Sequence, residues 1–424
     1  MKKASSKRGS INKQQLALES FEKRARRAYS EGHHQLALEA CLGATQINPR
    51  LAPAWIDAAV NCIKLERWES AIEYANRALN LGAKSLALFD ALSHAHGALK
   101  QWDQVRAFGL KALTLRNEMF SAPAPLPAPE VTVLPAPPSN QSRGRNLIAF
   151  SLFGRDSKYC ETAIINAQEQ PTIYPNWTCR FYIDDSVPAN IVQRLRNAGA
   201  QVRYVDEQAR HWPGPMWRFL ALSEPNLDRV LFRDADSVIS QREAQAVELW
   251  VSSGKRFHAM RDSASHTELL LAGLWGCVAG ALPNLDELLE LFAQQPMTST
   301  HFADQYFLRQ LVWPYARESL LQHDSVFGFL DAPPFPDGPA PADFHVGYAE
   351  GSPFFSLPTA LPEGTHVEWH FYRLDKVGTD TQRKRLCSYP ATVSNGQVRA
   401  HLPARYAHLI ESGSGDIRLK ARQE

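Results

Sequence analysis

Two hydrophobic patterns follow each other along the chain. Up to about residue 120, small apolar residues such as Ala37, Cys41 and Ala44 recur at i, i+4 and i+7, which places them on one helix face. From residue 145 onward, short apolar runs that end at Gly or Asp alternate with helix-like segments. The pattern therefore predicts an all-α region followed by an α/β region.

The α/β region opens with an apolar run at 147–153, which ends at Gly154 and predicts a buried strand. Further predicted strands are 180–183, 202–205, 229–232 and 256–260, and the predicted helices are 160–168, 190–198, 216–222 and 242–252. This alternation predicts a mostly parallel sheet with helices on both faces, and such sheets bind ligands beyond the carboxyl ends of their strands. Later in the chain, Asn395 and Gly396 predict a tight hairpin over 393–398.

The all-α region repeats with a period of 34 residues. The matching columns are Phe21, Trp55 and Phe89; His34, Trp68 and Trp102; Ala37, Ala71 and Val105; and Ala44, Ala78 and Ala112. Over about residues 15–118 this resembles the tetratricopeptide repeat, in which each 34-residue unit is a pair of helices. The resemblance implies an array that docks a peptide or a protein partner, or that dimerises. An ordinary helical bundle is the alternative.

A proline-rich stretch separates the two regions. Seven of the 28 prolines lie between Pro123 and Pro138, and proline favours an extended, semi-rigid chain. We predict a disordered basic tail at 1–14, repeats at 15–120, a linker at 121–144, an α/β domain at 145–380 and an extension with the hairpin at 381–424.

Composition and charge narrow the function classes. The net charge of +2 hides a repeat region with 18 Lys/Arg against 11 Asp/Glu, and a remainder whose net charge is −5. This balance gives no general attraction to nucleic acid. The six cysteines form no C-x-x-C pair, no apolar run is long enough to cross a membrane, and the basic start lacks the apolar stretch of a secretory signal. We expect a location in the cytoplasm, either free or at the inner face of the membrane.

The strongest candidate for chemistry is the segment 230–237. An apolar strand there delivers Asp234 and Asp236 at its exit, spaced so that both carboxylates can reach one hard cation. Mg²⁺ and Mn²⁺ prefer such oxygen ligands and leave positions open for phosphate oxygens. A solvated turn is the alternative.

With the segments 151–159, 215–222, 233–262, 271–276 and 303–308, this D-x-D motif resembles the GT-A class of glycosyltransferases. The resemblance covers about 145–375. It implies a Rossmann-like α/β domain, a nucleotide-sugar donor with a UDP-sugar favoured, Mn²⁺ or Mg²⁺, and a protein or glycan acceptor.

The resemblance also implies roles for individual residues. Asp236 and Asp234 are expected to hold the metal, with His345 as a third ligand and His323 as the alternative to it. The expected donor-binding residues are Ser151, Phe153, Gly154, Tyr159, Asp184, Arg218, Arg233 and Asp234. Core packing for Tyr159, a simple turn for Asp184 and a clamp for Arg233 are the alternatives.

The acceptor side and the base are assigned in the same way. The expected acceptor-binding residues are Gly273, Trp275, Gly276 and Gln305, with a core position as the alternative for Trp275. Asp262 and Asp304 are the candidates for the base that deprotonates an acceptor hydroxyl. Capping of a following helix is the alternative for Asp304.

Two other functions compete with this interpretation. The segment around Asp234 also matches the haloacid-dehalogenase pattern, in which Asp234 would be a nucleophile and Asp236 an acid or base. That family begins its domain with this strand, whereas several predicted strands precede it here. The second alternative is a non-catalytic repeat scaffold that carries a degenerate transferase domain.

Overall fold

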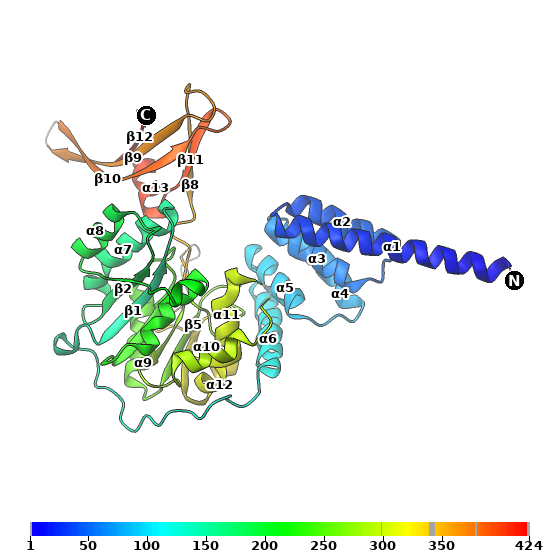
Figure 1. The fold of residues 1–424 in the computed structure, drawn as a ribbon, viewed down its shortest axis with the longest axis horizontal. Helices are drawn as coiled ribbons and strands as arrows, with labels where there is room; N and C mark the ends of the chain where they lie inside the picture. The colour runs from blue at the N-terminus through cyan, green and yellow to red at the C-terminus, as the bar shows by residue number, and fades with distance from the viewer. Residues whose placement is uncertain (1, 298, 339–343, 378–379, 422–424) are drawn as a thin grey trace. The chain divides into compact units, whose positions relative to one another are not determined.

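The computed structural model describes residues 2–297, 299–338, 344–377 and 380–421, and these fall into two compact units (Figure 1). The helical unit contains the chain up to Ala122 together with Arg261–Leu269 and His323–Pro334. The sheet unit contains the remaining segments. No described helix is both long enough and apolar enough to cross a membrane.

Six helices build the repeats of the helical unit. They are α1 (Lys2–Ser30), α2 (His34–Ile47), α3 (Ala52–Lys64), α4 (Trp68–Asn80), α5 (Leu86–Ala98) and α6 (Trp102–Met119). The helices α2, α4 and α6 begin 34 residues apart, and so do α3 and α5. The prediction of a helical repeat array is therefore confirmed.

The small residues at the repeat positions explain why the helices pack closely. Ala37, Ala58, Ala75 and Ala112 are fully buried, and the ring of Trp55 lies in the same core as Ala75 and Ala112. Alanine side chains let helix backbones approach each other, and the aromatic side chain fills the space that remains.

The basic start of the chain differs from the expectation. Residues 1–14 were predicted to be a disordered tail, but α1 is already helical from Lys2 onward. The stretch contains Lys, Arg, Ala and Gln, which favour helices, and it has no proline to interrupt one.

Two segments from later in the chain pack against α5 and α6 inside the helical unit. Ser93 donates a 2.7 Å hydrogen bond to the carbonyl oxygen of Ala264. A Cβ on Gly97 would lie 2.3 Å from the Cβ of Ala264, and a Cβ on Gly109 would lie 2.0 Å from the ring of Phe327. These helices therefore need glycine where the segments cross them.

A buried ion pair adds to this packing. The Arg116 guanidinium binds both carboxylate oxygens of Asp90 at 2.9 and 2.7 Å, and its Nε lies 3.2 Å from Glu268. Thr267 donates a 2.7 Å hydrogen bond to Asp90. The two segments, Arg261–Leu269 and His323–Pro334, lie within 145–380, the range that the sequence predicted for the α/β domain.

The sheet unit is built on a seven-stranded sheet of order β3-β2-β1-β4-β6-β5-β7. The strands are β1 (Asn146–Leu152), β2 (Thr178–Ile183), β3 (Gln201–Tyr204), β4 (Arg229–Arg233), β5 (Phe257–Arg261), β6 (Trp275–Val278) and β7 (Leu320–Asp324). The first half is parallel, since β1 pairs with both β2 and β4 in parallel, and β6 is antiparallel to β4 and β5. The expected α/β region is present.

Helices connect these strands. They are α7 (Ser157–Ile173), α8 (Ala189–Asn197), the 3-10 helix η3 (Gly214–Ser223), α9 (Gln241–Ser252), α10 (Leu285–Ala293), α11 (Ala303–Phe307) and α12 (Trp313–Ala316). Asp156 caps α7 by accepting from the backbone N–H of Lys158, and Ser240 caps α9 by accepting from that of Glu243.

The C-terminal part of the sheet unit forms two small sheets. One has the order β10-β9-β12, with β9 (His366–Val377), β10 (Asp380–Thr392) and β12 (Gly415–Ala421), and α13 (Ala404–Glu411) precedes its last strand. The other pairs β8 (Phe354–Pro358) with β11 (Gln397–His401). The expected boundary at 380 thus falls at the first residue of β10 and divides a pair of strands.

The hairpin predicted over 393–398 is only partly formed. Asn395 and Gly396 take the positive φ values of 53° and 69° that a tight turn needs, and Ser394 bridges to Gln397. Beyond the turn the strands separate, since β10 pairs with β9 and β11 pairs with β8. Longer-range pairing has replaced the local one.

The proline-rich linker is held along the sheet unit. Arg229 donates hydrogen bonds of 2.6 and 2.8 Å to the carbonyl oxygens of Pro135 and Ala136. The hydroxyl of Tyr315 bonds to the backbone of Leu126 in both directions, at 3.0 Å each. The backbone of the linker, which forms no helix or strand at these residues, is therefore anchored to the sheet unit through its carbonyl oxygens and the Leu126 N–H.

Candidate active site

A cavity of about 360 Å³ lies beyond the carboxyl ends of β1 and β4. It is lined by Ser151, Leu152, Phe153, Tyr159, Pro215, Arg218, Asp234, Ala235, Asp236, Ala272, His301, Phe302, Asp304 and Gln305. This is the position that parallel-sheet architecture predicts for a ligand. Eight of the sequence-predicted residues line it: Ser151, Phe153, Tyr159, Arg218, Asp234, Asp236, Gln305 and the base candidate Asp304.

Arg218 is the centre of the polar network in this cavity. It is 3% exposed and donates 2.6 Å hydrogen bonds to Asp234 and to Asp304. The backbone of Arg218 is fixed in turn, because its N–H donates to the Ser151 hydroxyl at 2.9 Å. Burial alone would lower the pKa of Arg218, but the two carboxylates outweigh burial and raise it.

The two carboxylates of the D-x-D motif have different partners. Asp234 binds Arg218, whereas Asp236 lies 3.1 Å from the ammonium of Lys158. Burial would lower the pKa of Lys158, but Asp236 raises it. A Cβ on Gly273 would lie 2.0 Å from the carboxylate of Asp234, so glycine leaves the space that this carboxylate occupies.

Asp304 is buried at the edge of the cavity. Burial raises its pKa, Asp234 adds to the effect and Arg218 opposes it. Asp304 lies inside α11 as its second residue, and one of its oxygens accepts from the Gln305 backbone N–H at 2.8 Å. It therefore faces the cavity as a carboxylate that takes up a proton more readily than an ordinary aspartate.

Gln305 holds a loop in place. Its amide oxygen accepts from the Ala272 N–H, and its amide nitrogen donates to the Leu270 carbonyl oxygen, both at 2.7 Å. Both ends of the side chain are therefore occupied, and Gln305 shapes the wall formed by Ala272.

The expected metal ligands are only partly brought together. Asp234 and Asp236 share the cavity, but His345 does not line it. His323 lies in the segment that packs in the helical unit, and burial lowers its pKa to about 4. Among the described residues, no group of three or more His, Cys, Asp and Glu side chains is placed to hold a metal ion.

Arg233 was predicted to bind the donor and Trp275 the acceptor, but both are core residues, which corrects the expectation. Arg233 is 2% exposed and donates from its Nε to Glu243 at 3.0 Å, so it clamps β4 to α9 and does not line the cavity. Trp275 is fully buried and stacks on Phe232, with 4.3 Å between ring centroids. Successive residues of a β-strand point to opposite faces of the sheet. The side chains of Arg233 and Trp275 point into the packed layers and not into the cavity.

Four further candidates also lie outside the cavity lining. Gly154 has a φ of +77° and donates its N–H to Ser186, and Asp184 accepts from Ser186 in the same turn. Gly276 leaves room for the backbone of β4. Asp262 lies in the segment 261–269 of the helical unit, where its N–H donates to His266.

Three residues with charged or aromatic side chains at the site were not predicted. Lys158 is the second residue of α7, whose N-cap is Asp156. Only its position next to the predicted residue Tyr159 could have indicated that it lies at the site. His301 and Phe302 line the cavity from a short 3-10 helix, with ring centroids 4.7 Å apart. No local pattern marks them, since only the tertiary fold brings this segment to the sheet edge.

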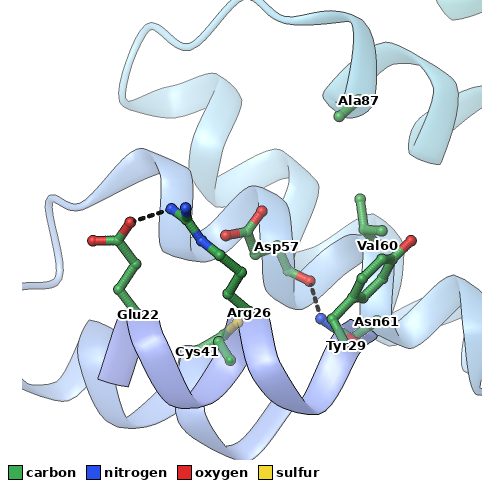
Figure 2. Close-up of a pocket in the computed structure, with 9 residues that line it drawn as sticks. Glu22, Arg26, Tyr29, Cys41, Asp57, Val60, Asn61 and Ala87 are labelled. Atoms are coloured by element: carbon green, nitrogen blue, oxygen red, sulfur yellow. Dashed lines mark hydrogen bonds and ion pairs between the residues drawn. The ribbon is translucent and has the colours of Figure 1, made fainter. Parts of the chain in front are cut away.

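The helical unit holds a second cavity, of about 410 Å³ (Figure 2). Its polar lining comes from α1 and α3: Glu22 and Arg26 form a 2.6 Å ion pair, and Asp57 and Asn61 lie across from them. Asn61 is 3% exposed, its amide nitrogen donates to the Asp57 carbonyl oxygen, and its amide oxygen has no partner within the described residues. The cavity therefore presents the carboxylates of Glu22 and Asp57 and the amide of Asn61 beside the Arg26 guanidinium.

No family model matches the chain, and no curated protein matches its sequence. Solved structures to which it is similar include the Arabidopsis OM64 TPR domain (18% identity, TM-score 0.24, 25% of this chain and 87% of that one). The TPR2B domain of yeast Sti1 in a complex with pHsp70 is 17% identical, with a TM-score of 0.24, over 25% of this chain and 85% of that one. A mutant of the Thermobaculum terrenum O-GlcNAc transferase is 14% identical, with a TM-score of 0.29, over 59% of this chain and 54% of that one.

Proposed function

We propose that the sheet unit is a glycosyltransferase of the GT-A type that uses a nucleotide-sugar donor and a divalent cation. The observation that supports this most is the cavity beyond β1 and β4, which gathers Asp234, Asp236, Asp304 and the buried Arg218. Carboxylates for a cation, a guanidinium for charge balance and a buried carboxylate of raised pKa are the groups such a transfer needs.

The residues present fit a cation that is bound together with its substrate. Mg²⁺ and Mn²⁺ are commonly held by one or two carboxylates, with phosphate oxygens and water completing the shell. Asp234 and Asp236 would hold it, and when bound it would offset the charge of a leaving nucleoside diphosphate. In the structure Asp236 pairs with Lys158 and Asp234 pairs with Arg218, so each carboxylate already has a cationic partner.

The chain's own residues supply orientation and proton transfer. Arg218 fixes Asp234 and Asp304 relative to each other through two 2.6 Å bonds. Asp304 accepts the proton of the acceptor hydroxyl, and its raised pKa makes it a stronger base than an ordinary aspartate. Phe153 and Tyr159 give the donor base and sugar an apolar wall.

The test is nucleotide binding with and without Mn²⁺, measured by titration calorimetry with UDP, GDP and CMP. We expect Mn²⁺ to raise the affinity for one of them at least tenfold, and Asp236→Asn to remove that gain. Asp185→Asn is the matched control, because Asp185 is an exposed aspartate on the turn after β2 and pairs with Arg210. Hydrolysis of the corresponding nucleotide sugar should fall at least a hundredfold in Asp236→Asn.

Other outcomes would select the alternatives. If none of the three nucleotides binds and Asp236→Asn changes nothing, the sheet unit is a non-catalytic scaffold. Release of phosphate from a phosphate ester, abolished by Asp234→Asn, would select the phosphatase interpretation. The bond from Arg218 engages one of the two carboxylate oxygens of Asp234, so the attack in that interpretation would have to come from the other.

We propose further that the helical unit docks a protein partner or acceptor at the cavity between α1 and α3. The free amide oxygen of Asn61 and the carboxylates of Glu22 and Asp57 would receive a lysine or arginine side chain. Burial raises the pKa of Asp57, Glu22 raises it further and Arg26 lowers it, so a bound cation would stabilise its charged form.

A further inference from the structure

A third cavity lies at the turn between β1 and α7, where the two small C-terminal sheets meet it. It measures about 550 Å³, a size that accommodates a sugar-sized ligand. The turn and the start of α7 contribute Arg155, Asp156 and Ser157, and the two C-terminal sheets contribute the rest. Nothing in the proposed transfer uses this cavity.

The cavity is rich in hydrogen-bond donors. Arg155 and Arg399 are both exposed at its edge, and neither pairs with a carboxylate among the described residues. The guanidinium of Arg399 lies over the ring of Phe354, 3.5 Å from its centroid, which fixes its plane and leaves its N–H groups available.

A buried donor without a partner borders the same space. The indole of Trp369 is fully buried between Tyr389 and Phe355, and its Nε1–H has no hydrogen-bond partner within the described residues. An orphaned donor of this kind costs free energy unless a ligand or water satisfies it.

The negative groups near the cavity are already engaged. Asp156 is the one carboxylate among the lining residues, and it accepts the Lys158 backbone N–H at 2.8 Å as the cap of α7. Arg155 also borders a neighbouring cavity with Asp185 and Glu368, but Asp185 pairs with Arg210 at 2.7 Å. The charge that faces the cavity is therefore positive.

We propose that this cavity binds a sugar that carries an oxyanion, either a phosphate ester or a carboxylate. Arg399 and Arg155 bind the oxyanion, since guanidinium matches the geometry of both groups. The Trp369 indole N–H and the imidazole of His401 then bind sugar oxygens; His401 already donates from its Nδ1 to the Ser352 carbonyl oxygen at 3.1 Å, which leaves Nε2 for the ligand. The backbone around it is held by the 2.7 Å bond from Ser157 to the His401 carbonyl oxygen.

The experiment measures binding to the full chain in the absence of any nucleotide, so its outcome is independent of the proposed transfer. The probes are glucose 6-phosphate, glucuronate, inorganic phosphate and glucose. We expect glucose 6-phosphate and glucuronate to bind at least tenfold more tightly than glucose. Inorganic phosphate should bind more weakly than whichever of these two charged sugars has the higher affinity. A preference between phosphate ester and carboxylate identifies the natural oxyanion.

Variants locate the site. Arg399→Gln and Arg155→Gln should each weaken the binding of the charged sugar at least tenfold. Arg418→Gln is the control with the same charge change, because Arg418 is exposed on β12, pairs with Asp416 and does not line the cavity. In ¹⁵N spectra, the indole N–H signal that Trp369→Phe removes should shift on addition of the charged sugar and not of glucose.

Three results would overturn the proposal. One is no binding of either charged sugar, and another is equal loss of binding in Arg418→Gln and Arg399→Gln. The third is tight binding of the charged sugar with no change in the Trp369 signal, which would place the ligand elsewhere.

Discussion

At Gly273, one missing carbon atom decides where the carboxylate of Asp234 lies. A Cβ there would come within 2.0 Å of the Asp234 Oδ2 and 2.5 Å of its Cγ. The carboxylate would have to turn away, and its 2.6 Å bond to Arg218 would break. Gly273 is therefore a spacer for the D-x-D motif, whereas the sequence assigned it to the acceptor.

This role predicts the outcome of a double-mutant cycle. Gly273→Ala should lower the free energy of unfolding by about 1–3 kcal/mol, as overpacking does, because the carboxylate and Arg218 are both displaced. In an Asp234→Ala background the same change should cost less than about 0.5 kcal/mol, since the colliding atoms are gone. Urea unfolding of the four proteins measures both values, and equal costs in the two backgrounds would contradict the assignment.

At the scale of elements, α5 and α6 show why helices of the 34-residue repeat contain glycine. Gly97 and Gly109 lie within these helices, where glycine is destabilising relative to alanine by about 1 kcal/mol. The structure explains this weakness, because Ala264 and Phe327 approach the helix backbones at these two positions.

The sign of a Gly109→Ala change should therefore depend on Phe327. In the wild-type chain it should destabilise by about 1–3 kcal/mol, because the buried ring has to move. In a Phe327→Ala background it should stabilise by about 1 kcal/mol, since only the helix propensity of alanine remains. Chemical unfolding followed by far-ultraviolet circular dichroism decides it, and the same sign in both backgrounds would rule out the packing described for α6.

At the scale of the whole molecule, the helical unit is not confined to the first part of the chain. Deleting residues 1–120 would leave Ala264, Glu268 and Phe327 without the partners that α5 and α6 provide. Loss of activity after such a deletion would therefore not separate a docking role from a folding role. Point changes in the cavity between α1 and α3 separate them.

We expect Glu22→Gln with Asp57→Asn to weaken the binding of a fluorescent oligolysine peptide at least tenfold. The control is Glu39→Gln with Glu118→Gln, an equal charge change at exposed positions outside that cavity. Because the pKa of Asp57 is raised, peptide binding should weaken as the pH falls through that raised value, and the weakening should begin at a higher pH than for an ordinary aspartate. Fluorescence anisotropy across pH measures both effects, and equal affinities for the two double variants would refute the docking site.

The sequence by itself determined the periodic and local features of this protein. The 34-residue spacing of small and aromatic residues predicted the helix pairs, because each helix must present one apolar face to its neighbours. The strands β1 to β5 appear within about two residues of their predicted ranges, since short segments with apolar residues alternate with helix-like segments there. The exit of β4 was enough to place Asp234 and Asp236 at one cavity.

Only the tertiary structure decided which side chain faces the cavity and which faces the core. Arg233 and Asp234 are neighbours in sequence, yet one is buried against Glu243 and the other borders the cavity, because Arg233 ends β4 and Asp234 begins the turn beyond it. The partners Lys158 and Asp304, the packing of 261–269 on α5 and α6, and the separation of β10 from β11 all join residues far apart in the chain. Such pairings depend on the closure of long loops and on complementary shape, and no local pattern of polar and apolar residues records them.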